Sequence, residues 1–274
     1  MTQSPPVDYD VLISGAGLVG ACCALALTPT GLRVCLLDKS PPSGQRRDPS
    51  MRVSAINRAS ENILRAVGAW HAIARARPAV FRRIEVWDAA STGTISFDAA
   101  EAGLSHLGYI VPNAVMVSAL QETLAGHDQI NMQFGDAPVA MAPAEDHVTV
   151  ELASGTTLNA RLVIGADGAH SAVRELASIR WDEADYHHTA IVATVTPDQA
   201  PAETARQRFL PGGPLAFLPL DDTQCSIVWS VKSAMAEQLM ALDDKAFAAE
   251  LAEAFEHRLG TIHAVSQRLA LPLI

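Results

Sequence analysis

The chain contains little of what several classes of protein require. Of its 274 residues only 5% are aromatic and 18% charged, whereas 49% are hydrophobic, with 17 glycines and 16 prolines spread along the sequence. This composition excludes a disordered chain, a collagen, a coiled coil and a disulfide scaffold. Basic residues are also scarce, because 20 Lys and Arg stand against 30 Asp and Glu. The resulting net charge of -10 argues against nucleic-acid binding, which needs a basic face to neutralise phosphates.

Metal motifs, hydrolase motifs and membrane segments are also missing. The four cysteines form no CxxC pair, which gives no indication of a zinc site and favours small buried side chains in a reducing cytosol. No GxSxG elbow supports Ser-His-Asp hydrolysis. The uncharged run from Val11 to Leu27 follows two acids rather than basic residues, contains three glycines and ends at Pro29. A signal peptide or a membrane span is therefore disfavoured, and we expect no transmembrane segment.

A dinucleotide fingerprint stands at the start of the chain. An apolar strand over 9–14 leads into Gly15-Ala16-Gly17-Leu18-Val19-Gly20, a helix follows over 21–27, and a second strand over 33–38 ends in Asp38. Gly15 permits the tight turn, Gly17 lets the backbone approach a pyrophosphate, and Gly20 lets the helix pack against the strand. Asp38 can accept hydrogen bonds from a ribose diol and would repel a 2′-phosphate, so this pocket favours FAD or NAD over NADP. A glycine-rich turn without a ligand is the alternative.

Two later segments add candidate residues. Arg52 precedes a helix predicted over 58–67 and could contact a phosphate or lie in solvent. A strand over 158–164 runs into Gly165-Ala166-Asp167-Gly168-Ala169-His170-Ser171, which places Asp167 at the carboxyl edge of a sheet, where nucleotides bind in doubly wound folds. Ser171 is a suitable N-cap for the next helix. The simpler interpretation of this segment is an Asp-Gly β-turn.

These motifs together resemble the class A FAD-dependent aromatic hydroxylases with the p-hydroxybenzoate hydroxylase fold. The runs Arg52–Asn57, Ser105–Gly108, Gln207–Phe209, Leu215–Leu220 and Cys225–Ser230 are similar to the ubiquinone-biosynthesis hydroxylases, and most similar to the 2-polyprenylphenol (C5) hydroxylase branch. The resemblance extends from Asp10 to Leu273. It implies an α/β (α+β) fold in which a Rossmann-like FAD-binding domain is combined with a mixed-sheet substrate domain.

The resemblance also implies how the chain is divided. The FAD-binding domain is discontinuous, over 1–80 and 105–180, and the substrate domain comprises 81–104 and 181–274. The third flavin motif of the family, Gly-Asp-Ala-Ala-His, and the C-terminal helices are absent, so the chain is expected to be truncated. Gly135-Asp136-Ala137 is a decoy, because it precedes the second flavin motif and Pro138 prevents a helix from following.

Individual roles follow from the resemblance alone. Gly15, Gly17 and Gly20 hold the FAD pyrophosphate, Asp38 binds the adenosine ribose where the family more often has Glu, and Arg52 lies near the flavin phosphates. Asn113 meets the flavin side, and Asp167 with Gly168 binds the ribityl or pyrophosphate region. Pro112 departs from the family, which usually has Glu at this position. The resemblance therefore implies eight candidate cofactor-binding residues: Gly15, Gly17, Gly20, Asp38, Arg52, Asn113, Asp167 and Gly168.

The implied reaction is hydroxylation of a polyprenylated phenol in ubiquinone biosynthesis. NADH or NADPH reduces the flavin, oxygen adds to give a C4a-hydroperoxide, and one oxygen atom is transferred to the ring. His188 is the candidate catalytic residue for moving a phenol proton, although a strand-end His187–His188 pair without a catalytic role is favoured over it. His170 is expected to be structural or solvent-facing. The run 214–220 lines the ring pocket or belongs to the core of the sheet.

Three functions remain open from the sequence. The first is the monooxygenase itself, a cytoplasmic enzyme that meets its membrane-soluble substrate at the inner-membrane surface or in a biosynthetic complex. The second is an inactive flavin-fold remnant that acts through partners. The third is an FAD oxidoreductase with another substrate, since a shared fold does not fix the substrate. The segment from Pro41 to Pro49 is expected to be a mobile loop.

Overall fold

The computed structural model describes residues 7–42 and 52–273, so most of the loop expected at Pro41–Pro49 lies outside the described residues. Contacts divide the chain into two units. The first comprises residues 1–48, 62–76 and 113–182, and the second comprises 49–61, 77–112 and 183–274. Residues 49–61, 77–80 and 105–112 therefore group with the second unit, although the sequence-based division assigned them to the FAD-binding domain. That functional assignment of the domains stays a prediction.

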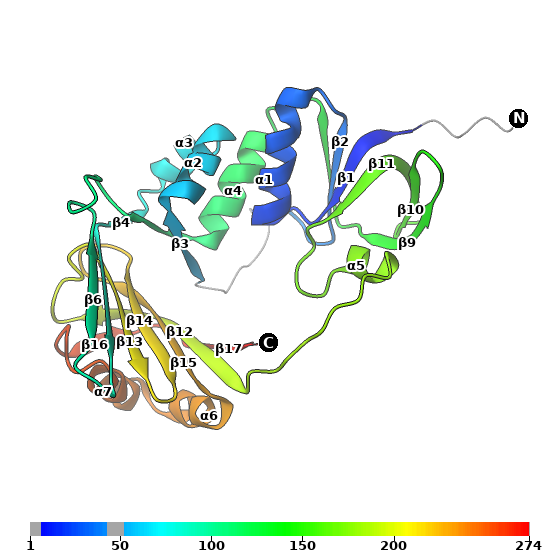
Figure 1. Cartoon of the computed structure of the whole chain (residues 1–274). Coiled ribbons are helices and arrows are strands. Elements are labelled where there is room, and N and C mark those ends of the chain that lie inside the picture. The colour runs from blue at the N-terminus through cyan, green and yellow to red at the C-terminus, as the bar shows by residue number, and fades with distance from the viewer. Residues whose placement is uncertain (1–6, 43–51, 274) are drawn as a thin grey trace, which may run out of the picture. The chain divides into compact units, whose positions relative to one another are not determined.

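The first unit is built on a six-stranded sheet in the order β8-β2-β1-β11-β10-β9 (Figure 1). Its first four strands run parallel, β10 is antiparallel to β11, and β9 is antiparallel to β10. The central strands are almost wholly apolar, as expected for parallel strands buried on both faces. The strand bounds are β1 Tyr9–Ser14, β2 Val34–Asp38, β8 Ile130–Phe134, β9 Pro138–Pro143, β10 Val148–Leu152 and β11 Thr157–Gly165.

Helices α1 and α4 pack against each other beside this sheet (Figure 1). They place buried Ala21, Ala24 and Leu25 of α1 and Met116 and Leu120 of α4 in the core. A short 3-10 turn over Thr28–Thr30 ends α1 at the predicted Pro29 break. The helix bounds are α1 Leu18–Leu27, α2 Arg58–Ala66, α3 Trp70–Arg75, α4 Asn113–Leu124 and α5 Ala172–Leu176.

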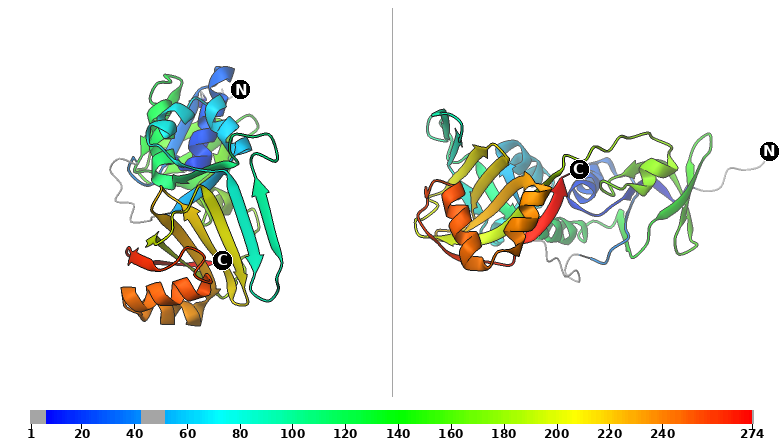
Figure 2. Two further views of the ribbon diagram at one scale, coloured as in Figure 1. Left: turned by 90° about the vertical axis from the view of Figure 1, so that its left-hand side faces the viewer. Right: turned by 90° about the horizontal axis from the view of Figure 1, so that it is seen from below.

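The second unit contains an eight-stranded mixed sheet, in the order β16-β12-β15-β14-β13-β5-β6 with β17 also paired to β12. Helices α6 (Ser233–Ala241) and α7 (Asp244–Ala254) cover one face, which we call the helix face (Figure 2). There Phe247 and Phe255 pack on Trp229, Phe217 and Trp87. The strand bounds are β5 Arg83–Asp88, β6 Thr94–Asp98, β12 His188–Pro197, β13 Thr204–Leu210, β14 Gly213–Pro219, β15 Cys225–Lys232, β16 Ile262–Val265 and β17 Leu269–Leu273.

A three-stranded antiparallel sheet completes the second unit, with β7 (Gly108–Pro112) between β3 (Val53–Asn57) and β4 (Ala79–Phe81). Phe81 and Ile110 of this small sheet form a core with Ala205 of the large sheet. The register pairs Val53 with Pro112, so Arg52 and Asn113 each directly adjoin this pair in the chain. The proline that departs from the family pattern is thus the last residue of β7.

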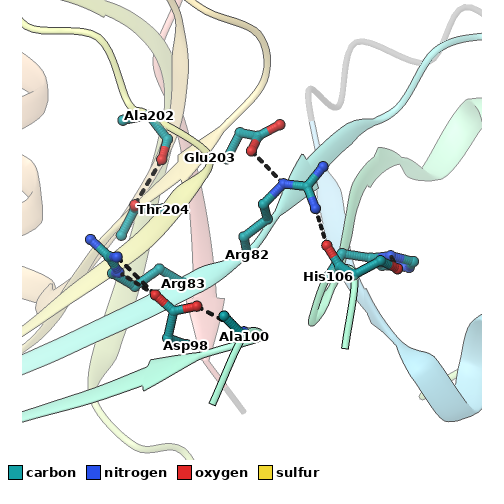
Figure 3. A network of polar contacts seen from close by, with 9 residues as sticks. Arg82, Arg83, Asp98, Ala100, His106, Ala202, Glu203 and Thr204 are labelled. Atoms are coloured by element: carbon teal, nitrogen blue, oxygen red, sulfur yellow. Dashed lines mark hydrogen bonds and ion pairs between the residues drawn. The ribbon is translucent and has the colours of Figure 1, made fainter. Parts of the chain in front are cut away.

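Buried charge is concentrated at the start of α2, in the second unit. The Glu61 side chain is fully buried, and its Oε2 accepts from Arg58 Nη1 at 2.7 Å and lies 2.9 Å from His106 Nε2. His106 Nδ1 lies 2.9 Å from the Ser105 hydroxyl. Arg82 donates to the Ser105 carbonyl and pairs with Glu203 at 2.7 Å, which connects this cluster to the edge of β13 (Figure 3). The contact between Glu61 and His106 joins α2 to the segment that precedes β7, across 45 residues of sequence.

The α/β fold class predicted from the sequence is confirmed, and so are most of its elements. The sequence pattern predicts a strand pair over 81–88 and 94–97, which appears as β5 and β6. Strand β9 begins at Pro138, so Gly135-Asp136-Ala137 starts no helix. The pattern also predicts an amphipathic helix over 246–259, but α7 ends at Ala254. Glu256 and His257 both have φ near +50°, a conformation that cannot continue a right-handed helix.

The cysteines give a chemical test of this packing. Burial raises the pKa of Cys35 and of Cys225 to about 12, whereas Cys22 and Cys23 are only half-buried in α1, with pKa values raised less. Because the thiolate is the nucleophile, iodoacetamide at pH 8 is expected to leave Cys35 and Cys225 unmodified in the folded protein and to modify Cys22 and Cys23 slowly. Peptide mass spectrometry before and after unfolding measures this. Fast labelling of Cys225 in the folded state would contradict the packing.

Candidate functional site

The glycine-rich turn between β1 and α1 places a bare helix N-terminus at the edge of the parallel sheet. Gly17 is the N-cap residue of α1 and provides no side-chain cap, and the first turn of the helix holds no acidic residue. The first N–H groups of a helix have no partner within it, and the helix dipole makes this end positive. The turn is therefore suited to an anion such as a pyrophosphate.

Two of the predicted glycines are required by close backbone contacts. A Cβ on Gly20 would lie 1.8 Å from the Gly15 carbonyl oxygen, and a Cβ on Gly15 would lie 2.2 Å from the carbonyl oxygen of Ala166. Gly15 also has a φ of +103°, which L side chains rarely adopt. A Cβ on Gly17 would meet nothing within 4 Å. Gly15 and Gly20 thus allow the close packing of the turn, whereas Gly17 faces open space.

Asp38 fixes this turn from the end of β2. Its Oδ2 accepts a hydrogen bond from the Ala16 backbone N–H at 2.9 Å, and its Oδ1 accepts from the Ser40 N–H at 2.8 Å. On the other side, the Gln121 amide of α4 donates to the Ala16 carbonyl at 3.1 Å. The turn is therefore held by groups that lie 22 and 105 residues away in the sequence.

Gln121 was not among the residues selected from the sequence. It is buried in α4 among apolar side chains, including Met116, Ala119 and Leu120. A polar residue on the buried face of a helix needs a hydrogen-bond partner. A glutamine among the apolar residues of this helix could therefore have been selected from the sequence as a residue with a specific contact. The sequence did not indicate that the partner would be the glycine-rich turn.

Asp167 organises the segment after β11. Its Oδ2 accepts from the backbone N–H groups of Ala172 at 2.8 Å and Val173 at 3.2 Å, and its Oδ1 accepts from the Ser171 hydroxyl. Ser171 Oγ in turn accepts from the Arg174 N–H at 3.0 Å, so the predicted N-cap of α5 is confirmed. The carboxylate therefore orders the local backbone, as the Asp-Gly turn interpretation expected, while it also faces a cavity.

These two segments enclose one cavity of about 280 Å³ in the first unit. Most of the predicted cofactor residues line it, and Gly20 lies directly behind Gly15. Lys39 and the exposed His170 add two basic side chains that the sequence analysis had not assigned to a ligand. The lining residues are Ser14, Gly15, Gly17, Asp38, Lys39, Ser40, Ala137, Ala166, Asp167, Gly168, His170 and Ala172.

The remaining predicted residues do not line this cavity. Asn113 is the first residue of α4 in the same unit, whereas the exposed Arg52 and the half-buried His188 belong to the second unit. The His188 Nδ1–H donates to the Tyr186 carbonyl at 2.6 Å, because a carbonyl can only accept. His187 is an exposed residue whose Nδ1 lies 3.0 Å from Asp185.

Two further classes of site find no support in the described residues. Within 7–42 and 52–273, no group of three or more His, Cys, Asp or Glu side chains is arranged to bind a metal ion. No helix in the same part of the chain is long and apolar enough to cross a membrane.

Comparison with known proteins places the whole of this arrangement in one family. The model of the family described as FAD binding domain matches residues 8–267. The chain is 36% identical over 264 residues to 3-demethoxyubiquinol 3-hydroxylase of Escherichia coli, covering 96% of this chain and 66% of that protein. It is 37% identical to the human "Ubiquinone biosynthesis monooxygenase COQ6, mitochondrial", covering 90% of this chain and 56% of that protein. The chain thus spans less than two thirds of the length of these relatives.

A solved structure agrees with the fold. A mutant of PqsL from P. aeruginosa superposes with a TM-score of 0.78 at 25% sequence identity, covering 97% of this chain and 73% of that one. Both the sheet with the glycine-rich turn and the large mixed sheet therefore have counterparts in a known protein.

Proposed function

Because the chain belongs to the FAD-binding domain family, with FAD as its cofactor, we propose that it is an FAD-dependent monooxygenase that hydroxylates a polyprenylated phenol in ubiquinone biosynthesis. The observation that carries the proposal is the cavity between the glycine-rich turn, Asp38 and Asp167. The relatives named for ubiquinone biosynthesis support the substrate class.

The residues of the cavity fit FAD. Gly15 and Gly17 would bring the uncapped N-terminus of α1 against the pyrophosphate, and Lys39 would add a cation beside it. Asp38, at the end of β2 and in the lining of the cavity, would accept hydrogen bonds from the ribose hydroxyls. Asp167 and Gly168 would bound the cavity on its other side. When bound, FAD supplies the oxygen-transfer chemistry, and the protein supplies binding, orientation and exclusion of water.

The predicted roles of Arg52, Asn113 and His188 remain proposals. Arg52 would neutralise a flavin phosphate, and Asn113, at the start of α4, would offer an amide to the flavin. Since His188 Nδ1 carries the proton donated to Tyr186, its Nε2 is the ring atom that could accept a proton from a phenol. We assign residues 1–80 and 105–180 to FAD binding and 81–104 and 181–274 to the substrate, with the reaction carried out at the inner-membrane surface.

The test is the purified chain with FAD, NADH or NADPH, oxygen and a farnesylated phenol. Flavin absorbance after gel filtration measures FAD binding, and mass spectrometry detects a product heavier by one oxygen atom. The proposal expects both signals. Bound FAD with NAD(P)H oxidation but no hydroxylated product would favour an oxidoreductase with another substrate. Failure to bind FAD at all would favour the inactive remnant and overturn the proposal.

A further inference from the structure

The large sheet has a second face, opposite the helix face, which we call the open face. On it the strand register aligns one row of side chains across β15, β14, β13, β5 and β6. These side chains are half-buried, apart from the last, which is 58% exposed. In order across the sheet they are Val228, Ala216, Gln207, Val86 and Ile95.

The small three-stranded sheet covers only the neighbouring part of the open face. Phe81 and Ile110 pack there on Ala205, with Ile84 and Leu218 beside them. The row that contains Gln207 lies next to the part of the open face that the small sheet covers. Phe209, two residues along β13 on the same face, is 46% exposed. The structure therefore leaves an apolar strip of sheet beside the small sheet, without a charged side chain in the row.

Gln207 is the polar member of this row, and its amide forms no hydrogen bond with any residue in 7–42 or 52–273. The Gln207 side chain is half-buried, so a ligand that covered its amide without a hydrogen bond would cost about 1–3 kcal/mol. The open face also contains the Ser226 hydroxyl, which is 1% exposed and has no partner among the described residues. Ser226 pairs with Leu218 of β14, one row away from Ala216.

We propose that Gln207 recognises the ring hydroxyl of a neutral phenol that lies on the open face. The small side chains of Ala216 and Val228 leave room for a flat ring, and the Gln207 amide supplies the single directional contact. Val86 and Ile95 continue the strip away from the ring, which suits an apolar chain on the phenol. This inference rests on the proposed function and identifies the residue that would distinguish a phenol from an apolar analogue. His188 shares the open face but lies on β12, three strands from β13 and four residues along β12 from Val192, which pairs with Val228 of the row.

The experiment compares two ligands and three proteins. The ligands are a farnesylated phenol and the same compound with hydrogen in place of the hydroxyl group. The proteins are the wild type, Gln207→Leu, and the control Gln238→Leu, which makes the same change at an exposed position of α6. Binding is measured by titration calorimetry with the full chain loaded with FAD.

The wild type and Gln238→Leu are expected to bind the phenol about tenfold more tightly than the deoxy analogue, since one net hydrogen bond is worth about that factor. Gln207→Leu is expected to bind both ligands equally. A phenol preference that survives in Gln207→Leu would overturn the inference and leave the proposed function intact. If the FAD-loaded wild type binds neither ligand, the inference and the phenol substrate are both wrong. Gln207→Met serves as the second variant if the leucine variant does not fold.

Discussion

Replacing Gly20 by alanine is expected to abolish FAD binding and to destabilise the first unit. The new Cβ would lie 1.8 Å from the Gly15 carbonyl oxygen and 3.2 Å from the Ala166 Cβ, so α1 has to move away from the turn that precedes it. Overpacking of this kind costs about 1–3 kcal/mol and occasionally more. Displacement of the helix N-terminus also removes the N–H groups that would face the pyrophosphate.

Gly17→Ala provides the matched control, because its Cβ meets nothing within 4 Å of protein and the residue has a φ of -75° that alanine readily adopts. This variant is expected to keep the wild-type melting temperature while its FAD dissociation constant rises at least tenfold, since the methyl group enters the space of the ligand. Thermal unfolding without FAD and flavin fluorescence titration separate the two effects. If Gly17→Ala and the wild type bind FAD with equal affinity, the pyrophosphate does not bind at this turn.

The second large effect is expected at the buried Glu61 cluster. In Arg58→Met the fully buried carboxylate loses its permanent cation at 2.7 Å, while His106 remains at 2.9 Å. Removal of one partner from a buried ion pair costs about 3–5 kcal/mol, and the lower end applies because 40% of the Arg58 side chain is exposed. Urea unfolding at pH 8 measures the loss.

Two controls test this explanation. Arg75→Met removes an exposed partner of Glu122 and is expected to cost less than about 1 kcal/mol at any pH. Adding Glu61→Gln to Arg58→Met removes the buried charge and should recover part of the lost stability. If the double variant is no more stable than Arg58→Met, the cost does not come from the buried carboxylate.

The glycine-rich turn shows how far the sequence reached. The sequence correctly predicts a glycine-rich turn, with Gly15, Gly17 and Gly20, between a strand and a helix. The strand, the turn and the helix follow one another within 19 residues, over 9–27, and each has its own local pattern. The end of α7 was placed too late, since the left-handed conformations of Glu256 and His257 depend on tertiary contacts. There the Glu256 carboxylate accepts from Trp87 and Arg208, which lie on other strands.

Local sequence patterns specify the α/β class, the order of the elements and the two turns that line the cavity, because hydrophobic period, glycine and capping residues act over a few neighbouring positions. Three contacts become visible only in the folded chain: Gln121 binds the turn at Ala16, Glu61 contacts His106, and Gln207 lies in an apolar row. These contacts depend on strand register and on packing between segments 45 to 105 residues apart. A shift of one residue in register would turn Gln207 to the helix face.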